Sequence, residues 1–324
     1  MRREARAFWI SEPGRGELRS VTVPEPGPDE VLVRTSWSAL SRGTESIVFS
    51  GRVPVSQYRT MRAPFQDGDF PGPVKYGYLN VGVVEQGPPE LTGRTVFCLY
   101  PHQSRYVVPA RSVVPVPQEV PAARAVLAGT VETAINALWD AAPLIGDAVT
   151  VVGGGMVGCC VARLLAGLPG ARVTLVDIDP ARAELATALG VGFALPDDAD
   201  AGQDLVVHAS ASSAGLQLSL DLLGPEGTVL DLSWYGDRQT TLALGGAFHS
   251  GRLTIRASQV GVVAAARRAS RTTSDRLALA LRLLADPAFD ALLAEPTSFA
   301  ELPALMARID ELPARCYLIS YQEE

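Results

Sequence analysis

Basic residues, long apolar runs and cysteines are all scarce in this sequence. Lys and Arg total 28 of 324 residues against 35 Asp and Glu, so the net charge is −7 and no basic surface is expected for a nucleic acid or a membrane. No stretch reaches the roughly 18 uncharged apolar residues of a membrane span. The N-terminus turns polar after three apolar residues, unlike a signal peptide. We therefore expect small molecules as partners.

The four cysteines are scattered and form no Cys-x-x-Cys pair; they are Cys98, Cys159, Cys160 and Cys316. This usage is typical of a reducing compartment and argues against a structural zinc site. We therefore expect a cytoplasmic protein.

Lysine is almost absent, since 27 of the 28 basic residues are Arg and the remaining one is Lys75. A position that stays Lys against a general bias toward Arg can need an amine, because a desolvated lysine shifts its pKa and an arginine does not. An ordinary solvated lysine is the alternative, and composition alone does not decide between them.

Two kinds of pattern divide the chain. Up to about residue 118, short β-branched runs broken by Pro and Gly predict an antiparallel, barrel-like β domain. These runs are Glu30–Arg34, Val81–Glu85, Arg94–Phe97, Arg105–Val108 and Val113–Val116. From Pro121 a helical stretch leads into alternating strands and helices, which predicts a doubly wound parallel sheet. Its strands are expected at Val149–Val152, Arg172–Val176, Asp204–Ala209, Thr228–Ser233 and Thr254–Ala257.

The C-terminal part predicts a return to the first domain. Amphipathic helices are expected at Asp275–Ala285 and Phe299–Asp310, followed by a strand at Tyr317–Tyr321. This strand has no neighbour in the predicted parallel sheet, so we expect it to pair in the N-terminal β domain.

A glycine-rich segment, Gly153-Gly154-Gly155-Met156-Val157-Gly158, lies between the first parallel strand and an apolar helix. In such a segment Gly153 allows a tight turn, Gly155 lets a pyrophosphate approach the backbone, and Gly158 lets helix and strand pack closely. The phosphates would face the helix N-terminus. The segment predicts a dinucleotide site, with Met156 and Val157 at its helical end.

A carboxylate follows at the expected distance. Asp177 ends the second strand, 24 positions after Gly153, where it would accept hydrogen bonds from the adenosine ribose. An anion there repels a 2′-phosphate, so NAD(H) is expected over NADP(H). Arg182 weakens that preference, and NADP(H) stays open. Ile178 and Arg182 complete the expected contacts on this side of the cofactor.

The chain resembles the medium-chain dehydrogenase/reductase superfamily over essentially its whole length. The residues that carry the resemblance are Glu30-Val31-Leu32-Val33, the Ser41–Glu45 segment, the run Gly77–Glu85, the helix at Thr133 and the glycine-rich turn with Asp177. The resemblance implies an α/β protein with a GroES-like β-barrel catalytic domain and a Rossmann nucleotide-binding domain. We expect the first at residues 1–120 with a return at 264–324, and the second at residues 121–263.

The sequence departs from the family where zinc is bound. Zinc-type members carry a Cys-Gly-Thr-Asp-like segment and a Gly-His-Glu segment. Here Arg42 replaces the cysteine, or Ser41 does if the alignment is shifted by one residue. Tyr78 and Leu79 replace the His-Glu pair. Neither Arg nor a tyrosine hydroxyl is a normal zinc ligand. The four-cysteine lobe is missing as well, so we expect no zinc.

Without a metal, side chains must polarise the carbonyl and move the proton. We expect Tyr78 to act as acid or base and Lys75 to lower the pKa of the Tyr78 phenol or to bind substrate. The alternative is that Tyr78 packs in a pocket with Lys75 outside.

Other polar residues are weaker candidates. The resemblance suggests that Glu45 hydrogen-bonds the substrate or orients Arg42, and that Arg42 binds the pyrophosphate. It also suggests that His102 relays a proton. In the helix that follows, Thr133 would contact the cofactor and Glu132 would act as an acid. Ser210, Ser233 and Trp234 end strands on the side of the sheet where cofactors bind. His208 and His249 are interpreted as structural.

The expected function is a zinc-independent, NAD(H)-linked oxidoreductase that interconverts a secondary alcohol and a ketone on a polyol, sugar-like or natural-product substrate. One alternative is a zinc-free enoyl or quinone reductase of the same superfamily. Another is a non-catalytic NAD(H)-binding sensor. By resemblance we expect a homodimer or homotetramer, with the segment Arg252–Val260 as a candidate edge for pairing.

Overall fold

A computed structural model describes residues 3–322. The chain divides into two compact units. Unit 1 comprises the chain up to Gly129, the segment Leu277–Ala285 and the chain from Leu293 onward; unit 2 comprises Thr130–Arg276 and Asp286–Leu292. Unit 1 reaches further than residue 120 because the helix Ala122–Ala125 packs on strands of the β domain. Within residues 3–322, no helix is long and apolar enough to cross a membrane.

Unit 1 contains two β-sheets. The larger has seven strands in the order β16-β17-β3-β6-β7-β9, with β8 paired to β3, and the smaller has the order β2-β1-β5-β4. The strands are β1 Arg3–Glu12, β2 Arg15–Val23, β3 Glu30–Leu40, β4 Asp67–Gly68, β5 Val74–Lys75, β6 Asn80–Gln86, β7 Thr95–Cys98, β8 Arg105–Pro109, β9 Val113–Pro115, β16 Thr297–Ser298 and β17 Tyr317–Ser320. The predicted β runs are confirmed in outline.

The C-terminal return is confirmed. Strand β17 pairs antiparallel with β3, with Tyr317 opposite Leu40 and Ser320 opposite Trp37. The N-terminal hairpin β1–β2 was not predicted. Arginines alternate with small residues at its start, so the segment lacks the run of β-branched residues that marks a strand. Ala5, Ala7 and Ile10 are nevertheless buried.

Unit 2 contains a six-stranded parallel sheet in the order β12-β11-β10-β13-β14-β15. Its strands are β10 Ala148–Val152, β11 Arg172–Val176, β12 Gly192–Ala194, β13 Gln203–His208, β14 Leu223–Asp231 and β15 Thr254–Ala257. Numbered along the chain from β10, this is the 3-2-1-4-5-6 order of the doubly wound nucleotide-binding fold. The predicted strands are confirmed, and the short β12 was not predicted.

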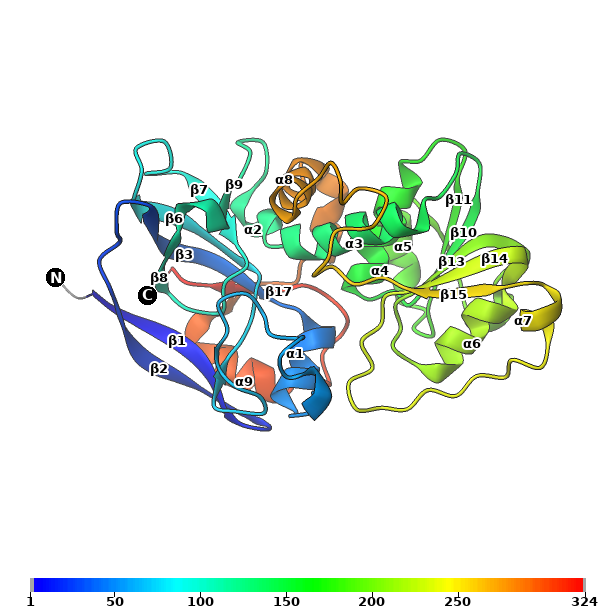
Figure 1. Cartoon of the computed structure of the whole chain (residues 1–324), viewed down its shortest axis with the longest axis horizontal. Coiled ribbons are helices and arrows are strands. Elements are labelled where there is room, and N and C mark those ends of the chain that lie inside the picture. The colour runs from blue at the N-terminus through cyan, green and yellow to red at the C-terminus, as the bar shows by residue number, and fades with distance from the viewer. Residues whose placement is uncertain (1–2, 323–324) are drawn as a thin grey trace. The chain divides into compact units, whose positions relative to one another are not determined.

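Helices cover both faces of this sheet. Figure 1 shows α4 (Met156–Ala166) and α5 (Arg182–Leu189) on one side and α6 (Ser213–Asp221) on the other. The strand order reverses between β10 and β13, so right-handed crossovers carry the helices to opposite faces. The carboxyl ends of β10 and β13 therefore border the crevice where ligands of this fold bind.

The remaining helices depart slightly from the predicted ranges. They are α1 Arg42–Phe49, α2 Ala122–Ala125, α3 Ala128–Ala141, α7 Ala247–Ser250, α8 Thr273–Leu283 and α9 Leu302–Ala307. The predicted helix from residue 122 is interrupted between α2 and α3. The predicted helix at Phe299–Asp310 begins as a 3₁₀ turn over Phe299–Glu301 and ends at Ala307.

Candidate functional site

The glycine-rich turn of unit 2 has the close contacts that its sequence predicts. Gly153 has φ +110°, and a Cβ there would lie 2.7 Å from the Ser210 nitrogen. At Gly158 a Cβ would lie 2.0 Å from the Gly153 carbonyl oxygen. Both positions therefore require glycine, the first for the turn and the second for the packing of α4 on β10.

Gly155 is different, because a Cβ there would meet nothing within 4 Å. It is the N-cap of α4, and no side chain caps this helix. The N–H groups of the first helical turn have no partner within the helix and carry its positive dipole end. An open space at a helix N-terminus fits a pyrophosphate.

Asp177 holds the turn from the second strand. Its Oδ2 accepts the Gly154 N–H at 2.6 Å and its Oδ1 accepts the Asp179 N–H at 2.9 Å. The adjacent Ile178 is 85% exposed, which suits an apolar contact with an adenine ring. Arg182 is buried against the turn, and its Nε lies 3.4 Å from Asp179 Oδ2. These residues fit a dinucleotide, with the phosphates at α4 and the ribose beside Asp177.

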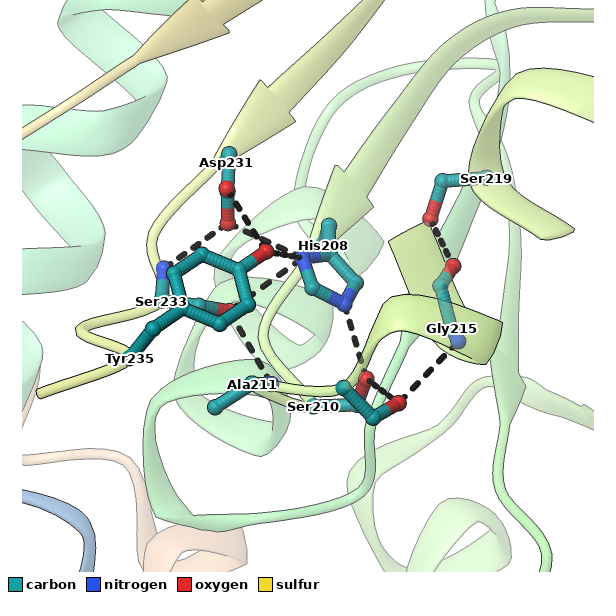
Figure 2. A network of polar contacts seen from close by, with 9 residues as sticks. His208, Ser210, Ala211, Gly215, Ser219, Asp231, Ser233 and Tyr235 are labelled. Carbon is teal, nitrogen blue, oxygen red and sulfur yellow. Dashed lines mark hydrogen bonds and ion pairs between the residues drawn. The ribbon is translucent and has the colours of Figure 1, made fainter. Parts of the chain in front are cut away.

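A polar network joins the ends of β13 and β14 (Figure 2). His208 is fully buried; its Nδ1 lies 2.9 Å from Asp231 Oδ1 and its Nε2 lies 2.7 Å from Ser210 Oγ. Ser233 Oγ and the Tyr235 hydroxyl lie 3.2 and 3.4 Å from Nδ1. The sequence interpretation of His208 as structural was incomplete, because His208 contacts two expected cofactor residues, Ser210 and Ser233.

Asp231 is the charged end of this network. Burial alone raises the pKa of Asp231, but hydrogen bonds from His208, the Ser233 N–H and Tyr235, together with the His208 charge, hold that pKa below its usual range. The carboxylate therefore stays ionised at neutral pH and accepts a proton-bearing Nδ1. Trp234, the neighbour of Ser233, is half-buried.

In unit 1 a second histidine pairs with a carboxylate. His102 Nε2 lies 3.0 Å from Glu45 Oε2, and the two side chains are only 1% and 2% exposed. The other ring nitrogen, Nδ1, lies 2.7 Å from Ser38 Oγ, which lies 3.0 Å from the Tyr321 hydroxyl. The structure thus brings together two residues, Glu45 and His102, that the sequence nominated separately.

Tyr78 is joined to this pair through Ser41. Its hydroxyl donates to Ser41 Oγ at 2.6 Å, and the Ser41 N–H donates to Glu45 Oε1 at 2.8 Å. Burial and the nearby Glu45 charge raise the pKa of Tyr78 to about 12. The expectation that Lys75 lowers the pKa of Tyr78 is therefore wrong, because desolvation and a neighbouring anion both disfavour the phenolate.

Lys75 has other partners. Its Nζ donates to Gln103 Oε1 at 2.9 Å, lies 3.9 Å from Asp67 Oδ2 and is 5.4 Å from the centre of the Tyr100 ring. Burial lowers the pKa of Lys75, partly offset by Asp67. Lys75 is thus a desolvated amine, as the sequence suggested, but it does not act on Tyr78.

Three further candidates have structural partners. The Arg42 guanidinium donates to the carbonyl oxygens of Ile309 and Asp310, each at 3.2 Å. Glu132 Oε1 accepts two hydrogen bonds from the buried Arg276, each at 3.0 Å; burial raises the pKa of Glu132 and Arg276 opposes that rise. Thr133 lies in α3. The roles expected for these residues stay predictions.

Ser41 and Tyr78, two of the residues that the resemblance sets against zinc ligands, form a hydrogen bond. Arg42, the other candidate for the cysteine position, bonds the Ile309 and Asp310 carbonyl oxygens instead. Within residues 3–322, no group of three or more His, Cys, Asp or Glu is placed to hold a metal ion. Zinc independence stays a prediction.

Sequence reasoning missed several members of the two networks: Ser38, Ser41 as the phenol's partner, Tyr321, Asp231 and Tyr235. Ser38 and Tyr321 are 283 residues apart, so no local pattern connects them. Asp231 had a weak signal, since it ends a strand beside the predicted crevice.

Comparison with solved structures shows the fold. No protein-family model matches the sequence, and a comparison with curated proteins gave no match. L-idonate 5-dehydrogenase from Escherichia coli K-12 is similar with a TM-score of 0.81 at 16% identity, over 99% of both chains. An alcohol dehydrogenase from Escherichia coli CFT073 complexed with NADH gives 0.77 at 16% identity, over 98% of both chains. A Sinorhizobium meliloti 1021 protein, classed with the zinc-binding dehydrogenases and bound to NADP, gives 0.79 at 16% identity, over 98% of this chain and 99% of that chain. The protein has the fold of these dehydrogenases.

Proposed function

We propose that the protein is a nicotinamide-dinucleotide-linked oxidoreductase of the alcohol dehydrogenase type, which works on a secondary alcohol or ketone without zinc and prefers NAD(H). The observation that carries the proposal is the turn from Gly153 to Gly158 with Asp177, because it combines two sterically required glycines with an open helix N-terminus. The neighbours in complex with NADH and NADP support a nicotinamide cofactor.

A nicotinamide dinucleotide held by the Gly153–Gly158 turn and Asp177 would supply the hydride chemistry when bound. Tyr78 supplies the proton to the substrate oxygen. Because burial and the Glu45 charge raise the pKa of Tyr78 to about 12, the phenol is protonated at neutral pH, and the protonated form is the one that can donate to the substrate oxygen. Glu45 and His102 act as positioning residues, because Glu45 holds the Ser41 backbone and Ser41 receives the phenol.

A polyol or sugar-like substrate is supported by the similarity to L-idonate 5-dehydrogenase. We place the protein in the cytoplasm because its four cysteines are scattered along the sequence and form no Cys-x-x-Cys pair. We also propose homo-oligomers that pair through β15, an edge strand whose four residues are all exposed. Light scattering of the wild type and of Ile255→Lys would test this pairing; an unchanged mass would contradict it.

The cofactor part is tested by NADH titration of wild type, Gly155→Ala and a matched control, Gly245→Ala. Both glycines have open space around an added Cβ. We expect Gly155→Ala to weaken NADH binding with a stability change below about 1 kcal/mol, because the methyl group would occupy the phosphate position. Gly245→Ala should bind as wild type does. Equal binding by all three proteins would contradict the site.

The reaction is tested by product analysis with NADH and paired ketone and enone substrates, and with polyols and NAD⁺. Reduction of the ketone supports the proposal, whereas reduction of the enone alone supports an enoyl or quinone reductase. NADH binding without turnover on a broad panel, unaffected by Tyr78→Phe, would indicate a sensor. Metal analysis that returned stoichiometric zinc would contradict the metal-free mechanism.

A further inference from the structure

When the His208 ring is neutral, the hydrogen bonds of its network can run in only one direction. Because the Asp231 carboxylate accepts only, the neutral His208 ring carries its proton on Nδ1 and leaves Nε2 as an acceptor. Ser210 must then donate its hydroxyl proton to Nε2. Ser212, whose Oγ accepts the Gly215 N–H at 3.0 Å, donates in turn to Ser210 Oγ at 2.9 Å.

This direction decides what Ser210 presents to a ligand. With its proton committed to His208, the Ser210 hydroxyl offers only a lone pair. If His208 takes up a second proton, Nε2 becomes a donor and both lone pairs of Ser210 are filled, by His208 and by Ser212. The Ser210 proton is then released toward the ligand. One proton on His208 therefore converts Ser210 from an acceptor into a donor.

Ser210 lies beside the phosphate-binding turn. A Cβ on Gly153 would lie 2.7 Å from the Ser210 nitrogen, so the two backbones are in contact. Two N–H groups of the turn are already used, since Gly153 donates to the Val176 carbonyl at 2.8 Å and Gly154 donates to Asp177. A pyrophosphate held there needs further donors, and the exposed Ser210 is well placed to provide one.

The local backbone keeps Ser210 in position. The following residue, Ala211, has φ +51°, a left-handed conformation that disfavours a side chain with a Cβ. Its N–H donates to Ser233 Oγ at 3.1 Å, which ties the turn to the end of β14. Strain of this kind is typical of residues whose position matters for binding.

We propose that His208 couples binding of the nicotinamide dinucleotide to the uptake of one proton, with Ser210 as the group that then donates to a phosphate oxygen. The inference rests on the proposed cofactor site. Two effects act in the same direction, because the protonated ring adds a positive charge near the phosphates and also frees the Ser210 proton. The ionisable groups that face the ring are Asp231 and Tyr235, and Asp231 offsets the cost of burying the second proton.

The test is the dissociation constant of NADH at pH 6 and pH 8, with calorimetry at pH 7 in two buffers of different ionisation enthalpy. Histidine is the side chain that changes its charge in this range. One coupled proton changes the constant by at most about tenfold per pH unit, and we expect binding at pH 6 to be at least roughly threefold tighter. The two buffers should give different apparent enthalpies, with the sign of proton uptake.

Variants test whether His208 is the group that takes up the proton when NADH binds. His208→Asn should bind NADH with a constant that varies little between pH 6 and pH 8, whereas the matched control His249→Asn, an exposed histidine of the same unit, should behave as wild type. Ser210→Ala keeps the ring but loses the donor, so its binding should weaken more at pH 6 than at pH 8. This variant provides the test if His208→Asn fails to fold in a thermal melt.

The outcomes separate the two proposals. No NADH binding by the wild type at either pH would overturn the proposed cofactor site. NADH binding with the same constant at both pH values, or a pH dependence that survives in His208→Asn or disappears in His249→Asn, would overturn the proton coupling alone.

Discussion

Each unit of the molecule contains a histidine–carboxylate pair, and the pairs His102–Glu45 and His208–Asp231 differ in what surrounds them. In unit 1, His102 and Glu45 are both buried; His102 also bonds Ser38 and packs against the Phe8 ring, and Glu45 also accepts the Ser41 N–H. In unit 2, His208 is buried, but Asp231 is 13% exposed and Ser210 is exposed. The first pair has protein on every side, which suits a fixed scaffold. The second ends at a serine that a ligand can reach.

The largest effect is expected for Tyr78→Phe, which should lower turnover without changing the affinity for NADH. Tyr78→Phe removes the proton donor, and we expect turnover to fall by about 10²- to 10⁴-fold. NADH affinity should stay unchanged, because the substitution leaves the glycine-rich turn and the Asp177 hydrogen bond to it intact. Steady-state kinetics and fluorescence titration measure the two effects. Normal turnover by Tyr78→Phe would remove Tyr78 from the mechanism.

The next largest effect is expected on stability, when the carboxylate of either pair, Glu45 or Asp231, is removed. Glu45→Ala leaves His102 and the Ser41 N–H without their buried acceptor, so we expect the free energy of unfolding to fall by about 2 kcal/mol. Asp231→Ala should cost about 1 kcal/mol, because water reaches this site more easily. Denaturant titrations of both variants provide the comparison. A larger loss for Asp231→Ala would reverse our ranking of the two pairs.

The pH dependence of stability should show the Asp231 contact. Because the pKa of Asp231 is lower in the folded protein than in the unfolded chain, its contribution is complete above about pH 4 and is lost as the pH falls through the native pKa. Asp231→Asn should therefore flatten the acid end of the melting-temperature profile. An Asp231→Asn profile parallel to that of wild type below pH 4 would contradict this assignment.

The smallest effect is expected at Lys75. Since Lys75 bonds Gln103 and does not act on Tyr78, Lys75→Met should leave the pH profile of ketone reduction unchanged. No ionisation of Tyr78 should appear in that profile below about pH 10, because its pKa is about 12. If the pH profile of Lys75→Met showed an additional ionisation near neutral pH, Lys75 would have to influence Tyr78 after all.

The local patterns were sufficient for the dinucleotide turn. Gly153, Gly158, Asp177 and the run of parallel strands were all recognised from short stretches of sequence, although the backbone that closes on Gly153 belongs to the distant Ala209 and Ser210. The proton-donating site was harder to predict. Tyr78 and Lys75 are three residues apart, yet they contact different groups, because the segment is not helical and its side chains diverge.

By itself, the sequence determined the two-part architecture and the glycine-rich turn with the carboxylate that follows it. These features depend on periodicity and on spacing within one supersecondary unit. The tertiary structure alone decided which histidine meets which carboxylate, and therefore which phenol stays protonated and which serine can change its hydrogen bonding. The reason is physical: pKa values and hydrogen-bond directions depend on burial and on neighbouring charges, and folding brings those neighbours from distant parts of the chain.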